Sequence, residues 1–351
     1  MNRLCRAIAY YLPQFHPIPE NDAWWGKGFT EWTNTAKAKP LFPGHYQPHV
    51  PADLGFYDLR VPETRIAQAE MAREYGIEGF CYYHYWFAGK RLLERPFTEV
   101  LQSGEPDFPF CLWWANETWT GKWHGSPDRV LIEQTYPGKE DEERHFNTLL
   151  PAFLDKRYMK VDGRPIFLVY NPEQWPNTIK MTDYWRDLAF KNGLRGLYFI
   201  GVADETWNPS HNGFDASTTR IIFSYARKGD IRGTRKLINL YRKIFRQPRD
   251  VFSYRKAITH LTTTQNYRWN NHPCILPNWD NTPRCGLSGV VLDDSKPDLF
   301  QIHIKSIIKQ IVHKPFDQRL LFVKSWNEWA EGNHLEPDLR YGKKYLEVLQ
   351  S

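Results

Sequence analysis

The chain of 351 residues has a formal net charge of +6, a mean hydropathy of −0.62 and an aromatic content of 16%, with 15 tryptophans. This length suits one large domain, and no run of about 18 apolar residues occurs that could span a bilayer. The five cysteines are widely spaced and form no C-x-x-C pair, which argues against zinc or redox chemistry. Strand-like sequence begins by Ala7, so we expect no signal peptide and a cytoplasmic protein.

Short apolar or aromatic runs alternate with helical patterns, which is typical of parallel strands joined by helices. The predicted strands comprise residues 7–12, 79–83, 110–114, 166–170, 198–202, 221–224, 275–277 and 320–325. The predicted helices comprise residues 61–75, 182–191, 300–312 and 342–349. We therefore expect one α/β domain over residues 1–351, a (β/α)8 TIM-type barrel with long loops at its C-terminal rim.

An open, doubly wound sheet is the alternative architecture. Such a sheet usually has a glycine-rich turn after its first strand, whereas residues 13–17 here are Pro-Gln-Phe-His-Pro. The barrel is therefore favoured.

Polar and aromatic residues follow seven of the predicted strands. In a barrel these segments meet at the C-terminal rim, where active sites lie. The candidate substrate-binding residues are Gln14, His16, Trp24, Trp25, Glu31, Trp32, His84, Tyr85, Trp86, Asn116, Glu117, Trp119, Asn171, Trp279, Asp280, Arg284, Trp326 and Asn327. Loops expected at the opposite rim, such as residues 105–107 and 161–164, lack aromatic residues. Because sugar sites combine aromatic faces with polar groups, this asymmetry indicates a carbohydrate cleft.

Two glutamates, Glu328 and Glu331, directly follow the last predicted strand and are the candidate catalytic residues. Cleavage of a glycosidic bond needs one carboxyl group that lends a proton and another that stays charged. Residues three apart point to opposite sides of an extended strand, so the two can share a pocket only if the chain turns after Trp326. Gly332 favours such a turn. A solvated loop without chemistry is the alternative, but the flanking aromatic residues favour a site.

A pair of histidines and a basic segment bear on whether the chain binds a metal ion or an anionic partner. His45 and His49 are four apart, but Pro48 between them argues against a helical pair of metal ligands, so we predict no metal and no cofactor.

Residues 227–256 hold eleven Lys or Arg against two Asp, within an amphipathic pattern. This segment is either a barrel helix with a charged outer face or a contact for an anionic partner, such as the inner face of the membrane or a lipid-linked diphosphate. No motif indicates nucleic-acid binding.

Four motifs together resemble the glycoside hydrolase family 99-like, WbsX-type proteins. They are Tyr-Tyr-Leu-Pro-Gln-Phe-His at residues 10–16, Gly-Phe-Thr-Glu-Trp at 28–32, Trp-Ala-Asn-Glu at 114–117 and Trp-Asn-Glu-Trp-Ala-Glu-Gly at 326–332. The resemblance covers almost the whole chain and adds Tyr11 and Trp114 to the candidate substrate-binding residues. It implies a (β/α)8 barrel that acts on glycans, typically in O-antigen or capsule synthesis, where such proteins are often labelled glycosyltransferases.

The biochemically understood relatives in this resemblance are retaining endo-α-mannosidases and mannanases. It implies that Glu328 is the base that draws the proton from a sugar 2-hydroxyl, so that this oxygen forms a 1,2-anhydro sugar. It implies that Glu331 first protonates the leaving oxygen and then activates water or another acceptor. This chain has Ala330 where the signature of these relatives has a histidine. The difference bears on whether the chain shares their preference for mannose.

Three functions follow in order of preference. The first is a retaining endo-glycoside hydrolase or transglycosidase that acts on a bacterial surface polysaccharide or its lipid-linked precursor. The second is a metal-independent glycosyltransferase, since the chain has neither a D-x-D motif nor a phosphate-binding glycine loop. The third is a glycan-binding protein without catalysis, which would need neither glutamate.

Overall fold

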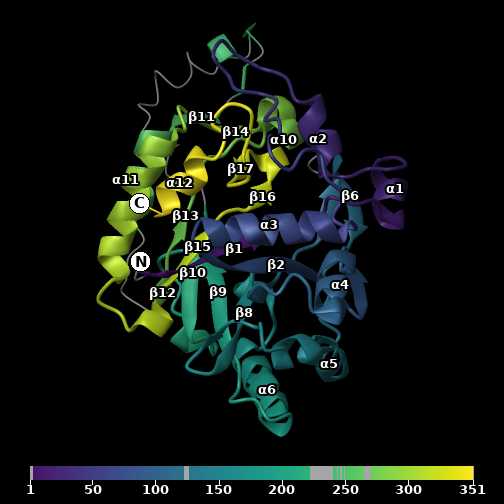
Figure 1. Ribbon diagram of the computed structural model, residues 1–351. Helices are drawn as coiled ribbons and strands as arrows, with labels where there is room; N and C mark the ends of the chain where they lie inside the picture. Colours follow the sequence, from purple (N-terminus) through teal and green to yellow (C-terminus); the bar gives the residue numbers. More distant parts are fainter. Residues whose placement is uncertain are drawn as a thin grey trace.

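The computed structural model describes residues 3–121, 126–221, 240–242, 244–245, 247–248, 250–264 and 270–350. Parallel strands form a barrel at its centre (Figure 1). In order around the barrel, they are β12 (Asn271–His272), β10 (Ala216–Thr219), β9 (Tyr198–Ala203), β8 (Arg164–Val169), β4 (Phe110–Trp114), β2 (Ile77–Phe87), β1 (Arg6–Tyr11), β15 (Leu320–Val323) and β13 (Cys274–Ile275). The predicted (β/α)8 barrel is confirmed.

The barrel closes through a strand that Pro273 interrupts. β12 pairs with β10 on one side of this proline, and β13 pairs with β15 on the other. Pro273 has no N–H group, but its carbonyl accepts a hydrogen bond from the amide of Phe322 at 2.9 Å. β12 and β13 together therefore act as the seventh of eight strands.

Helices cover the outside of the barrel. Four were predicted from the sequence: α3 (Pro62–Glu74), α6 (Thr178–Lys191), α11 (Pro297–Ile311) and α12 (Lys344–Gln350). Three more are α4 (Arg95–Ser103), α5 (Lys139–Leu154) and α9 (Tyr254–Thr264). Pro62, Pro96 and Pro297 occupy the first turns of α3, α4 and α11, where the missing N–H has no intrahelical partner to lose.

Two strand predictions need correction. Residues 222–224 of the predicted sixth strand lie outside the described residues, and the sixth strand is the earlier β10. β10 reads Ala-Ser-Thr-Thr, so its small and polar side chains give no apolar run, although three of its four residues are buried. The seventh strand begins at residue 271 rather than 275, because the run is split by the proline.

The period of two along each strand decides which side chains reach the barrel interior. On β1, Tyr10 packs its ring against Trp113 and Phe322, at centroid distances of 4.2 and 5.4 Å. The next residue, Tyr11, points outward and donates its hydroxyl hydrogen bond to Gln68 of α3 at 2.7 Å. Neighbouring aromatic residues of one strand thus serve different layers of the molecule.

The segments that follow the strands form the C-terminal rim, at the upper and right side of Figure 1. Their elements are α1 (Pro19–Trp25), α2 (Glu31–Lys37), β5 (Trp119–Gly121), β6 (Ser126–Ile132), β11 (Asp250–Ser253), α10 (Thr282–Cys285), β14 (Val290–Asp293), β16 (Asn327–Glu328) and β17 (Asn333–His334). Two short strands, β3 (Lys90–Leu92) and β7 (Lys160–Val161), add antiparallel pairs to β2 and β8. The long rim segments are where the sequence places the candidate site.

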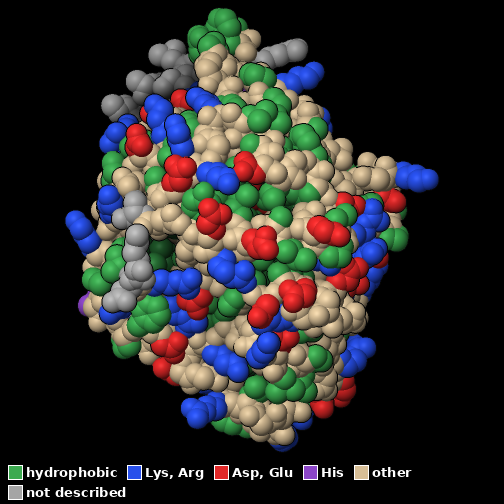
Figure 2. Space-filling view, in the orientation of Figure 1, with side chains coloured by type: hydrophobic (Ala, Val, Ile, Leu, Met, Phe, Trp, Pro, Cys, Tyr) green, Lys and Arg blue, Asp and Glu red, His purple; other side chains and the backbone are tan. Residues whose placement is uncertain are grey.

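The face shown in Figure 2 carries acidic and basic side chains interspersed with one another. This face therefore offers no extended surface of a single charge to a partner. Across the described residues, no helix combines the length and the apolar character needed to cross a membrane.

Candidate active site

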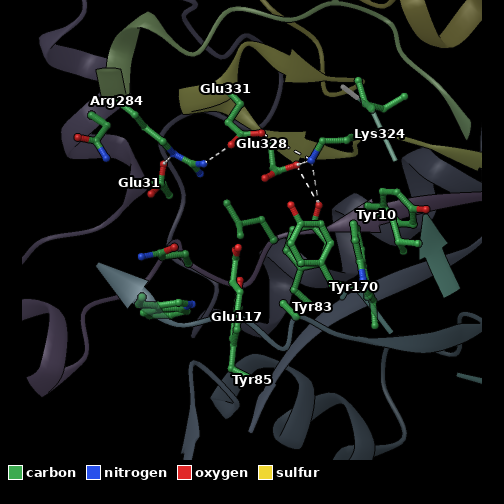
Figure 3. A pocket seen from close by; sticks show the side chains of 18 of the residues that line it. Tyr10, Glu31, Tyr83, Tyr85, Glu117, Tyr170, Arg284, Lys324, Glu328 and Glu331 are labelled. Carbon is green, nitrogen blue, oxygen red and sulfur yellow. Dashed lines mark hydrogen bonds and ion pairs between the residues drawn. The ribbon is translucent and has the colours of Figure 1, made fainter. Parts of the chain in front are cut away.

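A cavity of about 510 Å³ opens at the C-terminal rim. Its wall draws on β1, β2, β4, α1, α2, α10 and the segment after β15 (Figure 3). The volume falls within the range of roughly 300–1,000 Å³ that is typical of small-ligand sites. The cavity is therefore large enough to hold part of an oligosaccharide.

The two candidate catalytic glutamates both point into this cavity. Glu328 ends β16, and Glu331 lies in the 3-10 turn Trp329–Glu331 that follows, with exposed fractions of only 4% and 7%. The turn closes at Gly332, whose φ of 60° lies in the left-handed region. The amide of Asp280 donates to the Glu331 carbonyl at 2.7 Å and holds the turn in place. The expected turn after Trp326 thus brings both acids to one side.

Lys324 links the two carboxylates. Its Nζ lies 2.7 Å from Oε2 of Glu328 and 3.6 Å from Oε2 of Glu331. Burial alone would lower the pKa of Lys324, but the two carboxylates overcome it and raise that pKa above its ordinary value, so the side chain is an ammonium. Tyr83 completes the environment of Glu328, because its hydroxyl donates to the same Oε2 at 3.0 Å.

Arg284 holds Glu331 from the other side of the cavity. Its Nη1 donates to Oε1 of Glu331 at 2.6 Å, and its Nε donates to Oε2 of Glu31 at 3.0 Å. Glu31 opens α2, whose first turn is capped by the Thr30 hydroxyl. The guanidinium therefore joins a helix N-terminus to the candidate acid, and it is neutralised by two carboxylates.

The two glutamates have opposite pKa shifts. Burial raises the pKa of both, but for Glu331 the charges of Arg284 and Lys324 outweigh burial and lower it. For Glu328, burial and the charge of Glu331 prevail over Lys324 and raise the pKa. In the free protein Glu331 is thus the group that stays ionised, and Glu328 is the group that more readily holds a proton.

Ten of the candidate residues line the cavity. They are Gln14, Trp25, Glu31, Tyr85, Glu117, Trp119, Trp279, Arg284, Glu328 and Glu331. Aromatic side chains and carboxylates thus line the same cavity, as the asymmetry of the two rims predicts.

Four candidates lie on the outward face of their strands. On β2, Tyr83 and Tyr85 line the cavity, whereas His84 and Trp86 lie between them in sequence and contact His145 of α5. Trp114 of β4 packs on the same histidine, at a ring distance of 4.8 Å. The fourth, on β1, is Tyr11. The prediction placed His84 and Trp86 at the rim, and the resemblance added Tyr11 and Trp114 as substrate-binding residues. The strand period places all four in the layer between strands and helices.

The other eight candidates support the rim without lining the cavity; they are His16, Trp24, Trp32, Asn116, Asn171, Asp280, Trp326 and Asn327. Most satisfy buried backbone groups. Asn327 accepts from the amide of Leu12 at 2.7 Å and donates to its carbonyl at 3.1 Å. Asn116 and Asn171 exchange similar hydrogen bonds and join the ends of β4 and β8.

The remaining supporting candidates bind neighbouring side chains or backbone. Trp32 donates its indole hydrogen bond to the Tyr57 carbonyl at 2.7 Å, and a ring nitrogen of His16 lies 2.9 Å from the Pro13 carbonyl. Trp24 packs on Trp119, and Trp326 packs on Phe80. Asp280 accepts from Gln47 and pairs with His45 beside a second, smaller cavity.

Among the residues of the cavity wall that the sequence interpretation did not identify are Tyr10, Tyr83, Trp113, Tyr170, Arg220 and Lys324. Three of them, Tyr10, Tyr83 and Trp113, occupy inward positions on predicted strands, so the alternation of β1, β2 and β4 could have revealed them. Lys324 is the first polar residue after the apolar run 320–323.

Comparison with known proteins identifies the family. The family model described as "Glycosyltransferase WbsX" matches residues 7–349. Proteins described as "Uncharacterized protein WxcX", from two strains of Xanthomonas campestris pv. campestris (B100 and ATCC 33913), are each 38% identical over 344 residues, or 97% of this chain. The chain spans 48% of the length of these relatives.

Solved structures share the fold. A GH99 endo-alpha-mannosidase from Bacteroides thetaiotaomicron superposes with a TM-score of 0.59 at 13% identity, covering 98% of this chain and 95% of its own. A structure described as "Glycoside hydrolase-like protein" gives a TM-score of 0.60 at 15% identity, covering 99% and 93%. The chain belongs to the family described as glycosyltransferase WbsX, and its fold is the barrel of the GH99 glycoside hydrolases.

Proposed function

We propose that this chain is a carbohydrate-active enzyme that cleaves or transfers a glycosidic bond within a bacterial surface polysaccharide or its lipid-linked precursor. One observation carries the proposal: two buried carboxylates, Glu328 and Glu331, share the ammonium of Lys324 at one wall of an aromatic-lined cavity. Paired carboxylates that flank a sugar ring are what retaining and inverting glycosidases require. Trp25, Trp119 and Trp279 would offer faces on which sugar rings stack.

The roles of the two acids follow from the family resemblance. Glu328 takes the proton of a sugar 2-hydroxyl, and that oxygen attacks its own anomeric carbon to form a 1,2-anhydro sugar. The glycosidic oxygen leaves with a proton from Glu331, which then activates water or a sugar hydroxyl to open the anhydro ring. An enzyme carboxylate need not reach the anomeric carbon in this route, because the substrate supplies the nucleophile.

The pKa order of the free protein is the reverse of what these roles need. Glu331 must hold a proton to act as an acid, yet Arg284 and Lys324 lower its pKa. We therefore propose that a bound sugar displaces the guanidinium of Arg284 from Glu331. This displacement raises the pKa of the Glu331 carboxyl, which then takes up the proton that Glu328 more readily holds in the free protein. Lys324 then stays with Glu328 and keeps it ionised.

Glutamine variants test the proposal. A screen of defined oligosaccharides against Glu331→Gln and Glu328→Gln should find that binding persists while turnover falls about 10²- to 10⁴-fold. The variant of the acid should recover on substrates with an activated leaving group, such as a nitrophenyl glycoside, since these need no protonation. Recovery in Glu328→Gln instead of Glu331→Gln would exchange the two roles. Full activity in both variants would refute the assignment.

Transfer from a nucleotide sugar is the second candidate, and the description of the family favours it. Calorimetry with nucleotide sugars, with and without a glycan acceptor, separates it from hydrolysis: a hydrolase binds the glycan alone. The third candidate is a non-catalytic glycan-binding protein. It holds if the native chain turns no glycan over and both glutamine variants bind glycan as tightly as the native chain does.

We further propose that residues 227–256 contact an anionic membrane surface on the cytoplasmic side. Most of this segment lies outside the described residues. Within it, the apolar side chains of Leu240, Tyr241, Ile244 and Phe245 are each more than half exposed. Exposed apolar groups among Lys and Arg suit the headgroup region of a bilayer. Co-sedimentation that is no stronger with anionic than with neutral vesicles would refute the contact.

A further inference from the structure

Behind the acid-bearing turn, three buried side chains bring metal-ligating atoms together. They are His49, from the segment between α2 and α3, His334 of β17, and Asp338, which follows β17; their exposed fractions are 6%, 1% and 2%. Their ligand atoms all lie within 4.8 Å of one another. Two imidazoles and one carboxylate form a donor set that suits Zn²⁺.

The hydrogen bonds around His334 turn the lone pair of one ring nitrogen towards His49. Its Nδ1 lies 2.9 Å from the carbonyl oxygen of Glu336 and therefore carries the proton that it donates. The lone pair is then on Nε2, which accepts a hydrogen bond from Nδ1 of His49 at 2.9 Å, and a cation bound between the two rings would take the place of that proton. A ligating histidine usually donates its other ring N–H to a carbonyl or carboxylate in this way, which fixes the orientation of the ring.

A buried oxygen of Asp338 also points to a cation, independently of the clustering of the three donors. Its Oδ1 accepts the backbone amides of Arg340 and Tyr341, at 3.0 and 2.6 Å. Its Oδ2 is buried, makes no hydrogen bond of regular geometry with a described residue although the hydroxyl of Tyr46 approaches this carboxyl, and lies 3.9 Å from Nε2 of His334. A buried carboxylate oxygen without a partner is costly, and a cation between it and the two imidazoles would remove that cost.

Two of the three donor separations lie near the value for one tetrahedral ion, and all three lie within 4.8 Å. Two ligands bound at about 2.1 Å to a tetrahedral Zn²⁺ lie about 3.4 Å apart. The observed separations of 2.9 Å for His49 to His334 and 3.9 Å for His334 to Asp338 bracket that value.

We propose that His49, His334 and Asp338 bind one Zn²⁺ ion, with a structural role. The site differs from the His45–His49 pair considered in the sequence, because His45 instead pairs with Asp280. β17 pairs with β16, which carries Glu328, and the ring of His334 stacks on Trp329 at 3.8 Å. The ion would therefore fasten the segment before α3 to the hairpin that holds the two acids. This inference does not depend on the proposed reaction.

Metal content tests the site directly. The native chain, dialysed against ZnCl₂ and then against metal-free buffer, should retain about one Zn²⁺ per chain, and His334→Gln and Asp338→Asn should retain less than about one tenth as much. His45→Gln is the matched control: it removes a buried imidazole four residues from His49 but leaves the three donors, so its zinc content should equal that of the native chain. Equal zinc in the native chain and in the two ligand variants would overturn the proposal.

A second measurement needs no variant. Added Zn²⁺ should raise the Tm of the metal-free native chain by roughly 3–5 °C, and Co²⁺ in its place should give the visible absorption of a protein-bound ion. Mg²⁺, which prefers oxygen ligands, should do neither. A native chain that keeps no zinc after dialysis and shows no rise in Tm has no such site.

Discussion

Nη1 of Arg284 lies 2.6 Å from Oε1 of Glu331, so the candidate acid is held in its charged form by a buried guanidinium. The same side chain pairs with Glu31 at the start of α2. The contact positions Glu331 and sets its protonation at once, which makes Arg284 a position where stability and activity can be separated by measurement.

Arg284→Met should destabilise the fold by about 3–5 kcal/mol at pH 8, because it removes the guanidinium that pairs with two buried carboxylates, Glu31 and Glu331. The native pKa of Glu331 is lowered, so its stabilising contribution is present above the pKa of the unfolded chain and is lost as the pH falls through the folded value. The loss caused by the substitution should therefore shrink towards pH 4. Urea unfolding at pH 4, 6 and 8 measures it.

Arg60→Met is the matched control for that experiment. Its ion pair with Asp58 lies on the surface, with side chains 40% and 33% exposed. Surface pairs contribute about 1 kcal/mol or less. Equal destabilisation by the two substitutions would mean that the Arg284 contacts contribute no more than a surface pair.

Lys324→Met should move the acid limb of the pH–rate profile upward. Removing the ammonium takes away the charge that favours the ionised form of Glu328, so the pKa of that carboxyl rises further and less base is available at pH 7. The rate at pH 7 should fall about 10²-fold or more on the substrate that the oligosaccharide screen identifies. Carbon NMR of the glutamate carboxyls gives the same shift without an assay.

Tyr83→Phe separates charge from hydrogen bonding at the same oxygen. It removes one hydroxyl, at 3.0 Å from Oε2 of Glu328, and leaves Lys324 in place. The loss of one hydrogen bond to a carboxylate costs about 1.5 kcal/mol, or roughly tenfold in rate. An unchanged profile in Lys324→Met, with or without an effect of Tyr83→Phe, would contradict the role given to the ammonium.

Glu142 of α5 does not line the cavity, but it should make the stability of the fold depend on pH. Its carboxylate accepts from the indoles of Trp175 and Trp185, at 2.8 and 3.0 Å, but burial outweighs these bonds and raises its pKa to about 7. A carboxyl with a raised pKa stabilises the fold below its unfolded pKa, and this contribution is lost as the pH rises through about 7.

Glu142→Gln removes that titration. The free energy of unfolding of the native chain should fall by up to about 3 kcal/mol more than that of the variant between pH 4 and pH 8. Denaturant titrations at both values give the difference. Parallel curves for the two proteins would show that Glu142 has the same pKa folded and unfolded.

The barrel was predictable because apolar runs mark buried strands wherever the side chains are large. Residues 320–323 of β15 and residues 110–114 of β4 are such runs, and both are fully buried. β10 escaped prediction because buried threonine and serine look the same in sequence as a polar loop. Pro273 also concealed the seventh strand, since prolines ordinarily end strands rather than lie between two halves of one.

The candidate site was predictable where the chain leaves a strand, and less so where a strand continues. The predicted second strand ended at residue 83, so His84 and Trp86 were assigned to the rim together with Tyr85. β2 runs on to Phe87 because β3 pairs with its end, and the period of two then separates Tyr85 from its neighbours. Asn327 looked like a ligand residue, yet its amide satisfies the backbone of Leu12, a contact that no local pattern reveals.

Gly332→Ala should disable the pair of glutamates through the backbone alone. Gly332 has a φ of 60°, and a Cβ there would lie 2.8 Å from the amide nitrogen of Asp280, so both the conformation and the close approach exclude a side chain. We expect a loss of about 2–4 kcal/mol in stability and a fall in activity larger than that loss explains, since the turn that points Glu331 at Lys324 must open.

Gly342→Ala is the control, because its φ of 53° is similar but a Cβ there meets nothing within 4 Å. This substitution should cost about 1 kcal/mol and leave activity unchanged. Equal effects of the two substitutions on activity would show that the contact with Asp280 does not position Glu331.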